Sequence, residues 1–298
     1  VTIKYFAEDN VGNKEVAKSL NIQIDKTKPV VTSNITSGTY NSNQTISLTS
    51  NENGNIYYTL NGDNPSKAST QYSTPIEITE GKTIKAISID NAGNESDIVQ
   101  VVISFDRLAP VTEASISSGL YNTNQELVLS LRHQEQGEIY YSLDGSTPNK
   151  SSTIYSNPIQ ITESKVIKYF SIDTVGNEES IKTLDIQIDK INPSAQSNIT
   201  SGTYNQAQSV ELTLVNNESG RLYYTENGTS PKISGKLYLE AFQVAETKTI
   251  NYYAIDDAGN ESDIQTLAIE IDNVAPIVES SLNSGRYKDN QILELSIK

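Results

Sequence analysis

Residues 56–65 have the sequence Ile-Tyr-Tyr-Thr-Leu-Asn-Gly-Asp-Asn-Pro, and this stretch decides the fold. Alternation places Ile56, Tyr58 and Leu60 on one face of an extended strand and Tyr57 on the other. The Asn-Gly pair that follows favours a tight turn, because glycine adopts the positive φ that such turns need. The closing proline has no N–H and cannot continue the pairing. The stretch therefore predicts a half-buried strand that ends in a turn.

The same stretch recurs along the chain, together with two other markers of one period. It reappears as Ile-Tyr-Tyr-Ser-Leu-Asp-Gly from Ile139, and from Tyr223 as Tyr-Tyr-Thr followed by Asn227-Gly228. The motifs Ser-Gly-x-Tyr and Asp-x-x-Gly-Asn both recur every 81 to 83 residues, with glycines at Gly38, Gly119, Gly202 and Gly285 for the first and at Gly12, Gly93, Gly176 and Gly259 for the second. A period of this length indicates a tandem array of similar small domains.

Each repeat contains several further short alternating segments. Residues 44–49, 83–89 and 99–105 place branched or small apolar residues on one face, and their counterparts in the next two repeats do the same. Six or seven such strands in about 83 residues, with turn residues between them, predict an antiparallel β-sandwich with almost no helix. The fold class we expect is therefore all-β.

The domain boundaries follow from a proline that comes after an acidic residue at each junction, as at Asp106 and Pro110. They predict complete repeats at residues 28–108, 109–191 and 192–274. Residues 1–27 match the last two strands of a repeat, and residues 275–298 match the first two. We expect a parent chain that continues on both sides, with strand addition between chains as the alternative.

Composition excludes several classes of function. The chain has no Cys, Met or Trp and one His in 298 residues, which leaves no ligand cluster for zinc or iron–sulfur centres and no disulfide. Its 37 acidic and 22 basic residues give a net charge of −15 with no basic stripe, so nucleic acid and anionic membranes are poor partners. No apolar run approaches the length of a membrane span.

The central decapeptide resembles a known family. Residues 139–148, followed by Tyr155 and the Pro158-Ile159 pair, are similar to the C-terminal immunoglobulin-like domain of chitobiases and β-hexosaminidases. The first repeat matches it through residues 56–65, Tyr72 and Pro75-Ile76. The third keeps the motif's tyrosines but has Glu226 for the leucine and Ala241-Phe242 for the Pro-Ile pair. The resemblance implies immunoglobulin-like or fibronectin-III-like sandwiches, an accessory module without catalytic residues, and a secreted or cell-surface setting.

The Asp-x-x-Gly-Asn turns are candidate calcium sites, because carboxylate and amide oxygens are the ligands that calcium prefers. The candidate ligands are Asp90, Asn94, Asp173, Asn177, Asp256 and Asn260. The alternative is that the aspartate caps the turn while the glycine and asparagine take left-handed φ. Calcium could also join the junction acids to the turn of the next repeat, and these acids are Asp25, Asp106, Asp189 and Asp272. The alternative is that each is a solvated acid at a strand end, before an extended step into proline. No other cofactor is expected.

Tyr57, Tyr140 and Tyr223 lie on the face of their strand that points away from the inward residues. A repeated outward ring would suit stacking against the apolar face of a sugar. The alternatives are an aromatic cluster that shields the outer sheet, next to Ile87, Phe170 and Tyr253, or a lateral contact between neighbouring molecules.

These observations predict a non-catalytic extracellular segment that forms a stiff stalk, fibre or surface-layer-like assembly. We expect it to associate with itself or with other surface proteins. The alternative is a glycan-binding adhesin or an accessory array of a carbohydrate-active enzyme. Catalysis is not expected, because no pair of carboxylates or nucleophile constellation stands out, and the lone His133 lies in a polar turn. Glycosylation sequons occur at Asn34, Asn43, Asn94, Asn149, Asn198, Asn217, Asn227 and Asn260.

Overall fold

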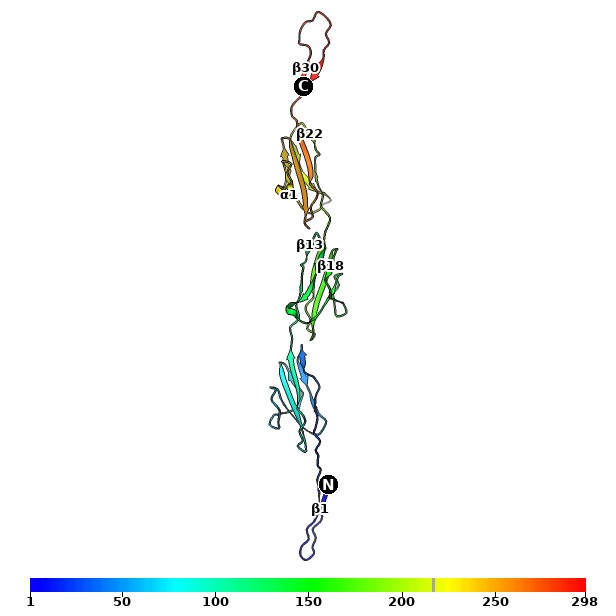
Figure 1. Ribbon diagram of the computed structural model, residues 1–298, viewed down its shortest axis with the longest axis vertical. Helices are drawn as coiled ribbons and strands as arrows, with labels where there is room; N and C mark the ends of the chain where they lie inside the picture. The colour runs from blue at the N-terminus through cyan, green and yellow to red at the C-terminus, as the bar shows by residue number, and fades with distance from the viewer. Residues whose placement is uncertain (216–217) are drawn as a thin grey trace. The chain divides into compact units, whose positions relative to one another are not determined.

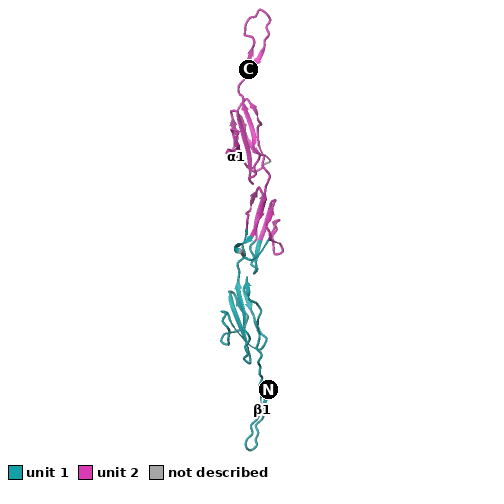
Figure 2. Ribbon diagram, viewed as in Figure 1, with its two compact units in different colours: residues 1–113, 130–140, 170–180 teal, residues 114–129, 141–169, 181–298 magenta. Residues whose placement is uncertain are grey.

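The computed structural model describes residues 1–215 and 218–298, and strands make up nearly all of its regular structure (Figure 1). The sequon at Asn217 lies outside the described residues. Two short helical segments, η1 (Arg132–Gln134) and α1 (Pro231–Ser234), lie in connections between strands. The chain divides into two compact units, one of residues 1–113, 130–140 and 170–180 and one of the remaining residues (Figure 2). Within the described residues, no helix is long and apolar enough to cross a bilayer.

The first complete repeat is a two-layered sandwich. One layer is a five-stranded sheet of order β4-β11-β10-β7-β8, in which only the β4–β11 pairing is parallel. The other layer consists of the antiparallel pairs β3–β6 and β5–β9. The strands are β3 (Val31–Ser33), β4 (Gly38–Tyr40), β5 (Gln44–Ile46), β6 (Leu48–Ser50), β7 (Gly54–Thr59), β8 (Thr70–Gln71), β9 (Ile76–Ile78), β10 (Lys82–Asp90) and β11 (Val99–Phe105).

The same strand order recurs in the second and third repeats, so the predicted tandem sandwiches are confirmed. The second repeat contains β12 (Thr112–Ala114), β13 (Gly119–Tyr121), β14 (Gln125–Leu127), β15 (Leu129–Leu131), β16 (Gly137–Ser142), β17 (Thr153–Ile154), β18 (Ile159–Ile161), β19 (Lys165–Asp173) and β20 (Lys182–Ile188). The third contains β21 (Ala195–Ser197), β22 (Gly202–Tyr204), β23 (Gln208–Val210), β24 (Leu212–Leu214), β25 (Gly220–Thr225), β26 (Lys236–Leu237), β27 (Phe242–Val244), β28 (Lys248–Asp256) and β29 (Gln265–Ile271).

The core of each repeat is built from the inward residues that alternation predicts. In the first repeat, Ile46 and Ile84 are completely buried, and Leu48, Ile78 and Ile103 are nearly so. Burying one such side chain contributes roughly 1.5–3 kcal/mol relative to leaving it exposed. The third repeat has its own cluster around Val210, Val244 and Ile250. Each of these two repeats therefore encloses a separate apolar core.

The Ser-Gly-x-Tyr motif fixes the edge of each five-stranded sheet. The Tyr40 hydroxyl donates to the carbonyl of Thr36 at 2.7 Å, and the Ser37 hydroxyl oxygen accepts from the N–H of Val102 at 2.9 Å. The matching tyrosines of the other copies donate to the carbonyl four residues upstream in the same way: Tyr121, Tyr204 and Tyr287. In the first repeat, the motif thus ties the second strand, β4, to the last strand, β11, next to the junction with the following repeat.

The terminal segments form short strand pairs. β1 (Thr2–Tyr5) pairs with β2 (Lys18–Asn21), and β30 (Val278–Ser280) pairs with β31 (Leu295–Ile297). Their apolar side chains, such as Tyr5 and Leu295, are exposed, whereas those of the complete repeats are buried.

Candidate functional site

The aspartate of each Asp-x-x-Gly-Asn motif closes its turn with two hydrogen bonds from the asparagine. Asp90, the last residue of β10, accepts from the backbone N–H of Asn94 through Oδ1 and from its side-chain Nδ2 through Oδ2, both at 2.8 Å. The same pair of bonds joins Asp173 to Asn177, Asp256 to Asn260 and Asp9 to Asn13. The aspartate therefore caps the turn directly through protein hydrogen bonds.

Only the glycine of this turn takes a positive φ. Gly93, Gly176 and Gly259 have φ values of 93°, 94° and 90°, and the asparagines are not among the residues with positive φ. The expectation that the asparagine also adopts left-handed φ is therefore wrong. In the first repeat, the Asp90 carboxylate orients the Asn94 side chain, and the backbone N–H and carbonyl of Asn94 are both hydrogen-bonded to Asp90.

The asparagine side chain also reaches the preceding repeat. Asn177 Nδ2 donates to the backbone carbonyl of Asp106 at 3.0 Å, and Asn260 Nδ2 donates to that of Asp189 at 3.0 Å. Asn94 Nδ2 makes the same contact with the carbonyl of Asp25 at 3.2 Å. Each amide thus uses one N–H for its own turn and the other for the repeat before it.

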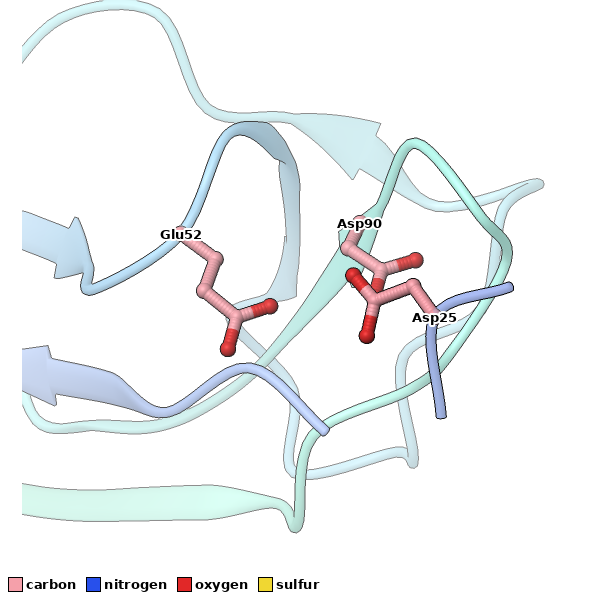
Figure 3. Close-up of side chains that lie close together, drawn as sticks. All are labelled: Asp25, Glu52 and Asp90. Atoms are coloured by element: carbon pink, nitrogen blue, oxygen red, sulfur yellow. The ribbon is translucent and has the colours of Figure 1, made fainter. Parts of the chain in front are cut away.

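Three carboxylates meet at each of these junctions. Carboxylate oxygens of Asp25, Glu52 and Asp90 lie within 4.8 Å of one another, on three separate segments (Figure 3). They line an open pocket of about 680 Å³. We call this arrangement the acidic triplet; the equivalent triplets are Asp106, Glu135 and Asp173, and Asp189, Glu218 and Asp256. The structure thus brings the junction acids next to the predicted turn aspartates.

The glutamate of each triplet was not predicted from the sequence. Glu52 follows β6, in the connection to β7, and belongs to neither recurring motif. Its signal was its spacing: Glu52, Glu135 and Glu218 are 83 residues apart, in register with the other markers. Glu52 does not stand out in the sequence, because acidic residues are common in turns of this composition.

Hydrogen bonds lower the pKa of two of the turn aspartates, Asp90 and Asp173. The hydrogen bond from the Asn94 side chain is the main cause that lowers the pKa of Asp90. Burial alone would raise the pKa of Asp173, but hydrogen bonds from the Asn177 side chain and from backbone N–H groups outweigh it and lower the pKa. In the part of the chain that the structure describes, no ion pair includes Asp25, Glu52 or Asp90. Two like charges 4.8 Å apart repel by about 1 kcal/mol at the dielectric constant of water.

Glu179, which follows the Asp-x-x-Gly-Asn turn of the second repeat, forms hydrogen bonds inside that repeat. Glu179 is 9% exposed, and its carboxylate accepts from the N–H of Thr112 at 2.9 Å and from the Ser171 hydroxyl at 3.0 Å. Both donors are buried. Glu179 is therefore an internal hydrogen-bond acceptor of the second repeat and lies outside the acidic triplet.

The outward tyrosines pack against the next strand of the sheet. Tyr57 on β7 lies opposite Ile87 on β10. Tyr140 is 7% exposed and stacks on Phe170 at 5.5 Å between ring centroids. Tyr223 stacks on Tyr253 at 5.7 Å. The structure therefore forms cross-strand aromatic pairs in the second and third repeats, and one face of each of these rings is occupied by its neighbour.

Polar and charged side chains make further contacts with these aromatic pairs. The Tyr140 hydroxyl donates to Glu138 at 2.5 Å, and this hydrogen bond is the main cause that raises the pKa of Tyr140. In the third repeat, Lys232 of α1 lies 5.3 Å from the ring centroid of Tyr253 and pairs with Glu261. Such contacts stabilise the outer face of the sheet and reduce the ring surface open to a ligand.

Comparisons with known proteins identify the repeats. The family model described as "Chitobiase/beta-hexosaminidase C-terminal domain" matches residues 35–100, 116–183 and 199–266. No curated protein matches the sequence significantly.

Similar solved structures are tandem domains. A three-domain I-band fragment of titin has 8% identity and a TM-score of 0.43, covering 83% of this chain and 100% of that one. Three N-terminal domains of the bacteriophage RB49 Hoc protein have 11% identity and a TM-score of 0.41, covering 82% and 99%. Fibronectin(III)-like modules of Clostridium thermocellum CbhA have 13% identity and a TM-score of 0.34, covering 54% and 94%.

Proposed function

The chain belongs to the chitobiase/beta-hexosaminidase C-terminal domain family, and we propose that it is a non-catalytic structural segment of an extracellular stalk or fibre. The family is an accessory domain type, which supports a role outside catalysis. Tandem domains of the immunoglobulin and fibronectin-III type are common in extracellular proteins, which supports a location at the cell surface.

The observation that carries this proposal is that the recurring polar groups lie at the junctions between consecutive repeats. The asparagine contacts and the acidic triplets recur at the junctions Asp25/Asp90, Asp106/Asp173 and Asp189/Asp256. A ligand-binding array would concentrate its recurring polar groups on an exposed face of each domain. Groups placed between consecutive domains instead limit how far one domain can move relative to the next. A stalk needs such limited movement between its domains.

Small-angle X-ray scattering of the intact chain tests the proposal. A stalk predicts the scattering of a uniform rod, with a cross-section the size of one sandwich and little dependence on salt. Scattering typical of domains on flexible tethers would contradict it.

The adhesin alternative has weaker support. Sugar stacking needs an open ring face, and the rings of Tyr140 and Tyr223 are each stacked on a neighbouring ring. Tyr57 lies opposite an aliphatic residue and is the best placed of the three. A glycan array probed with the intact chain tests this alternative. Binding of a sugar by the chain, and loss of that binding in Tyr57→Ala, would support the adhesin function.

Calcium binding stays a prediction. The triplets offer up to six carboxylate oxygens each, and calcium takes six to eight oxygen ligands. Because the turn aspartates already accept hydrogen bonds from asparagine, the turn itself closes without an ion. A divalent cation would act on the repulsion between the three carboxylates.

A further inference from the structure

The four copies of the Asp-x-x-Gly-Asn turn differ in what lies against them. A Cβ placed on Gly12, between β1 and β2, or on Gly93 would meet no atom within 4 Å. A Cβ placed on Gly176 would lie 3.3 Å from Nδ2 of Asn41, and one on Gly259 would lie 3.5 Å from Nδ2 of Asn122. The latter two turns therefore lie close against the preceding repeat.

The turn has the same geometry whether or not described atoms of another repeat lie near its glycine. Gly12 has a φ of 93°, within a few degrees of Gly176 and Gly259. Asn13 is bonded to Asp9 at 2.9 and 2.8 Å, as Asn177 is to Asp173 at 2.8 and 2.7 Å. The turn is therefore preorganised by its own residues, and its asparagine presents a second N–H in a fixed direction.

The acceptor of that N–H is equally fixed. The N–H of Asp106 donates to the carbonyl of Tyr40 at 3.1 Å, and the Asp106 carboxylate accepts from the N–H of Leu108 at 3.1 Å. The next junction has the same pattern, with Asp189 N–H donating to the carbonyl of Tyr121 at 2.9 Å. Tyr40 and Tyr121 end the Ser-Gly-x-Tyr motif, and the contacting Asn41 and Asn122 follow it directly. The two motifs that mark the period are thus the two halves of one interface.

We propose that Asn177 and Asn260 are positioning residues through which each repeat recognises the end of the repeat before it. The partner is a domain of the same kind that ends in Ser-Gly-x-Tyr-Asn and offers the carbonyl of its junction aspartate. The donor lies at one end of a repeat and the acceptor at the other, so the interface is heterologous and only head-to-tail order satisfies it. This inference rests on the proposed stalk function and assigns its stiffness to one small contact at each junction, in which the asparagine amide and the neighbouring turn glycine meet the end of the preceding repeat.

Distance measurements between spin labels test it, and the cysteine-free chain suits this method. Thr74→Cys, Asn157→Cys and Glu240→Cys place labels at equivalent exposed positions of the three repeats. In the intact chain, both neighbouring label pairs should give one narrow distance distribution. Asn177→Ala should broaden the 74–157 distribution and leave the 157–240 distribution narrow, and Asn260→Ala should do the converse. Asn13→Ala should change neither, because the hydrogen bonds of Asn13 go to Asp9 of its own turn.

A second variant separates docking from folding. Asn41→Ala leaves the turn of the second repeat intact and removes only the side chain that lies against Gly176. If Asn177→Ala unfolds the second repeat, broadening by Asn41→Ala still supports the proposal, and an unchanged width refutes it. A broad distribution in the parent chain would refute the stalk itself. A narrow distribution that survives both Asn177→Ala and Asn41→Ala would refute only the role of the asparagine.

Discussion

Replacing Glu179 by alanine is expected to destabilise the second repeat alone. Its carboxylate is the acceptor for the buried N–H of Thr112 and the buried hydroxyl of Ser171. Leaving a buried donor without this acceptor costs about 1–3 kcal/mol. The two together give a loss of about 2–4 kcal/mol, reduced because the variant no longer buries a charge. In a domain of this size, that corresponds to a fall in Tm of roughly 10–25 °C.

Glu179→Gln is the matched control. Glutamine keeps one side-chain oxygen that accepts a hydrogen bond, and its amide N–H can donate to the Ser171 hydroxyl oxygen, so the N–H of Thr112 and the Ser171 hydroxyl both keep a partner. Glu179→Gln should therefore lose much less stability than Glu179→Ala.

Hydrogen exchange of the intact chain, followed by mass spectrometry, is the appropriate assay. Peptides from β19 and β20 should exchange faster in Glu179→Ala, while peptides from β10 and β28 keep their protection. Unchanged protection of β19 would refute the reasoning. A Glu179→Gln variant no more stable than Glu179→Ala would also refute it, because the cost would then not come from the two donors that lose their acceptor.

Four further outcomes are expected. Calcium should raise the Tm of the intact chain, and a chelator should reverse this, if the acidic triplets bind the ion; an equal Tm in both conditions would exclude it. Gly176→Val forces a β-branched residue into a φ of 94°, which should cost roughly 1–3 kcal/mol in the second repeat, measured by calorimetry. Tyr140→Ala should destabilise the same repeat by about 3 kcal/mol, because its ring is buried; an unchanged Tm would mean that the outer face contributes little. The lowered pKa of Asp90 adds stability that is present above the unfolded-state pKa and lost as the pH falls below about 4, and Asp90→Asn should flatten this part of an acid titration.

Most of the fold could be predicted from local sequence. Alternation identified the core residues Ile84 of β10 and Val101 of β11 and the half-buried, core-facing residues of β7, and the Asn-Gly pair identified the turn at Gly62, whose φ is 83°. The parallel pairing of β4 with β11 could not be predicted in this way. β4 has three residues, too few to show a period, and its partner lies about 65 residues further along the chain. Only the three-dimensional packing decides such a pairing.

Only part of the candidate site could be predicted, because some of its contacts are local in sequence and others join distant residues. The hydrogen bonds from Asn94 to Asp90 lie within one turn and follow from the local motif. The contact of Asn94 with Asp25 spans 69 residues and depends on how one repeat follows another. For Tyr140, alternation showed which face the ring occupies but not what covers that face. Whether an outward residue is exposed is decided by its cross-strand neighbour, here Phe170.

Recurrence in a tandem array therefore needs a second criterion before it indicates a ligand site. A residue recurs in register when every repeat needs it, and a repeat needs residues for its core, its turns and its contact with the next repeat. Asn177 serves the last two at once, through one N–H to Asp173 and one to Asp106. A recurring ligand site would instead leave its polar groups unsatisfied by the protein. The asparagine amides are satisfied and the triplet carboxylates repel one another, so within this motif only the carboxylates retain a reason to bind an ion.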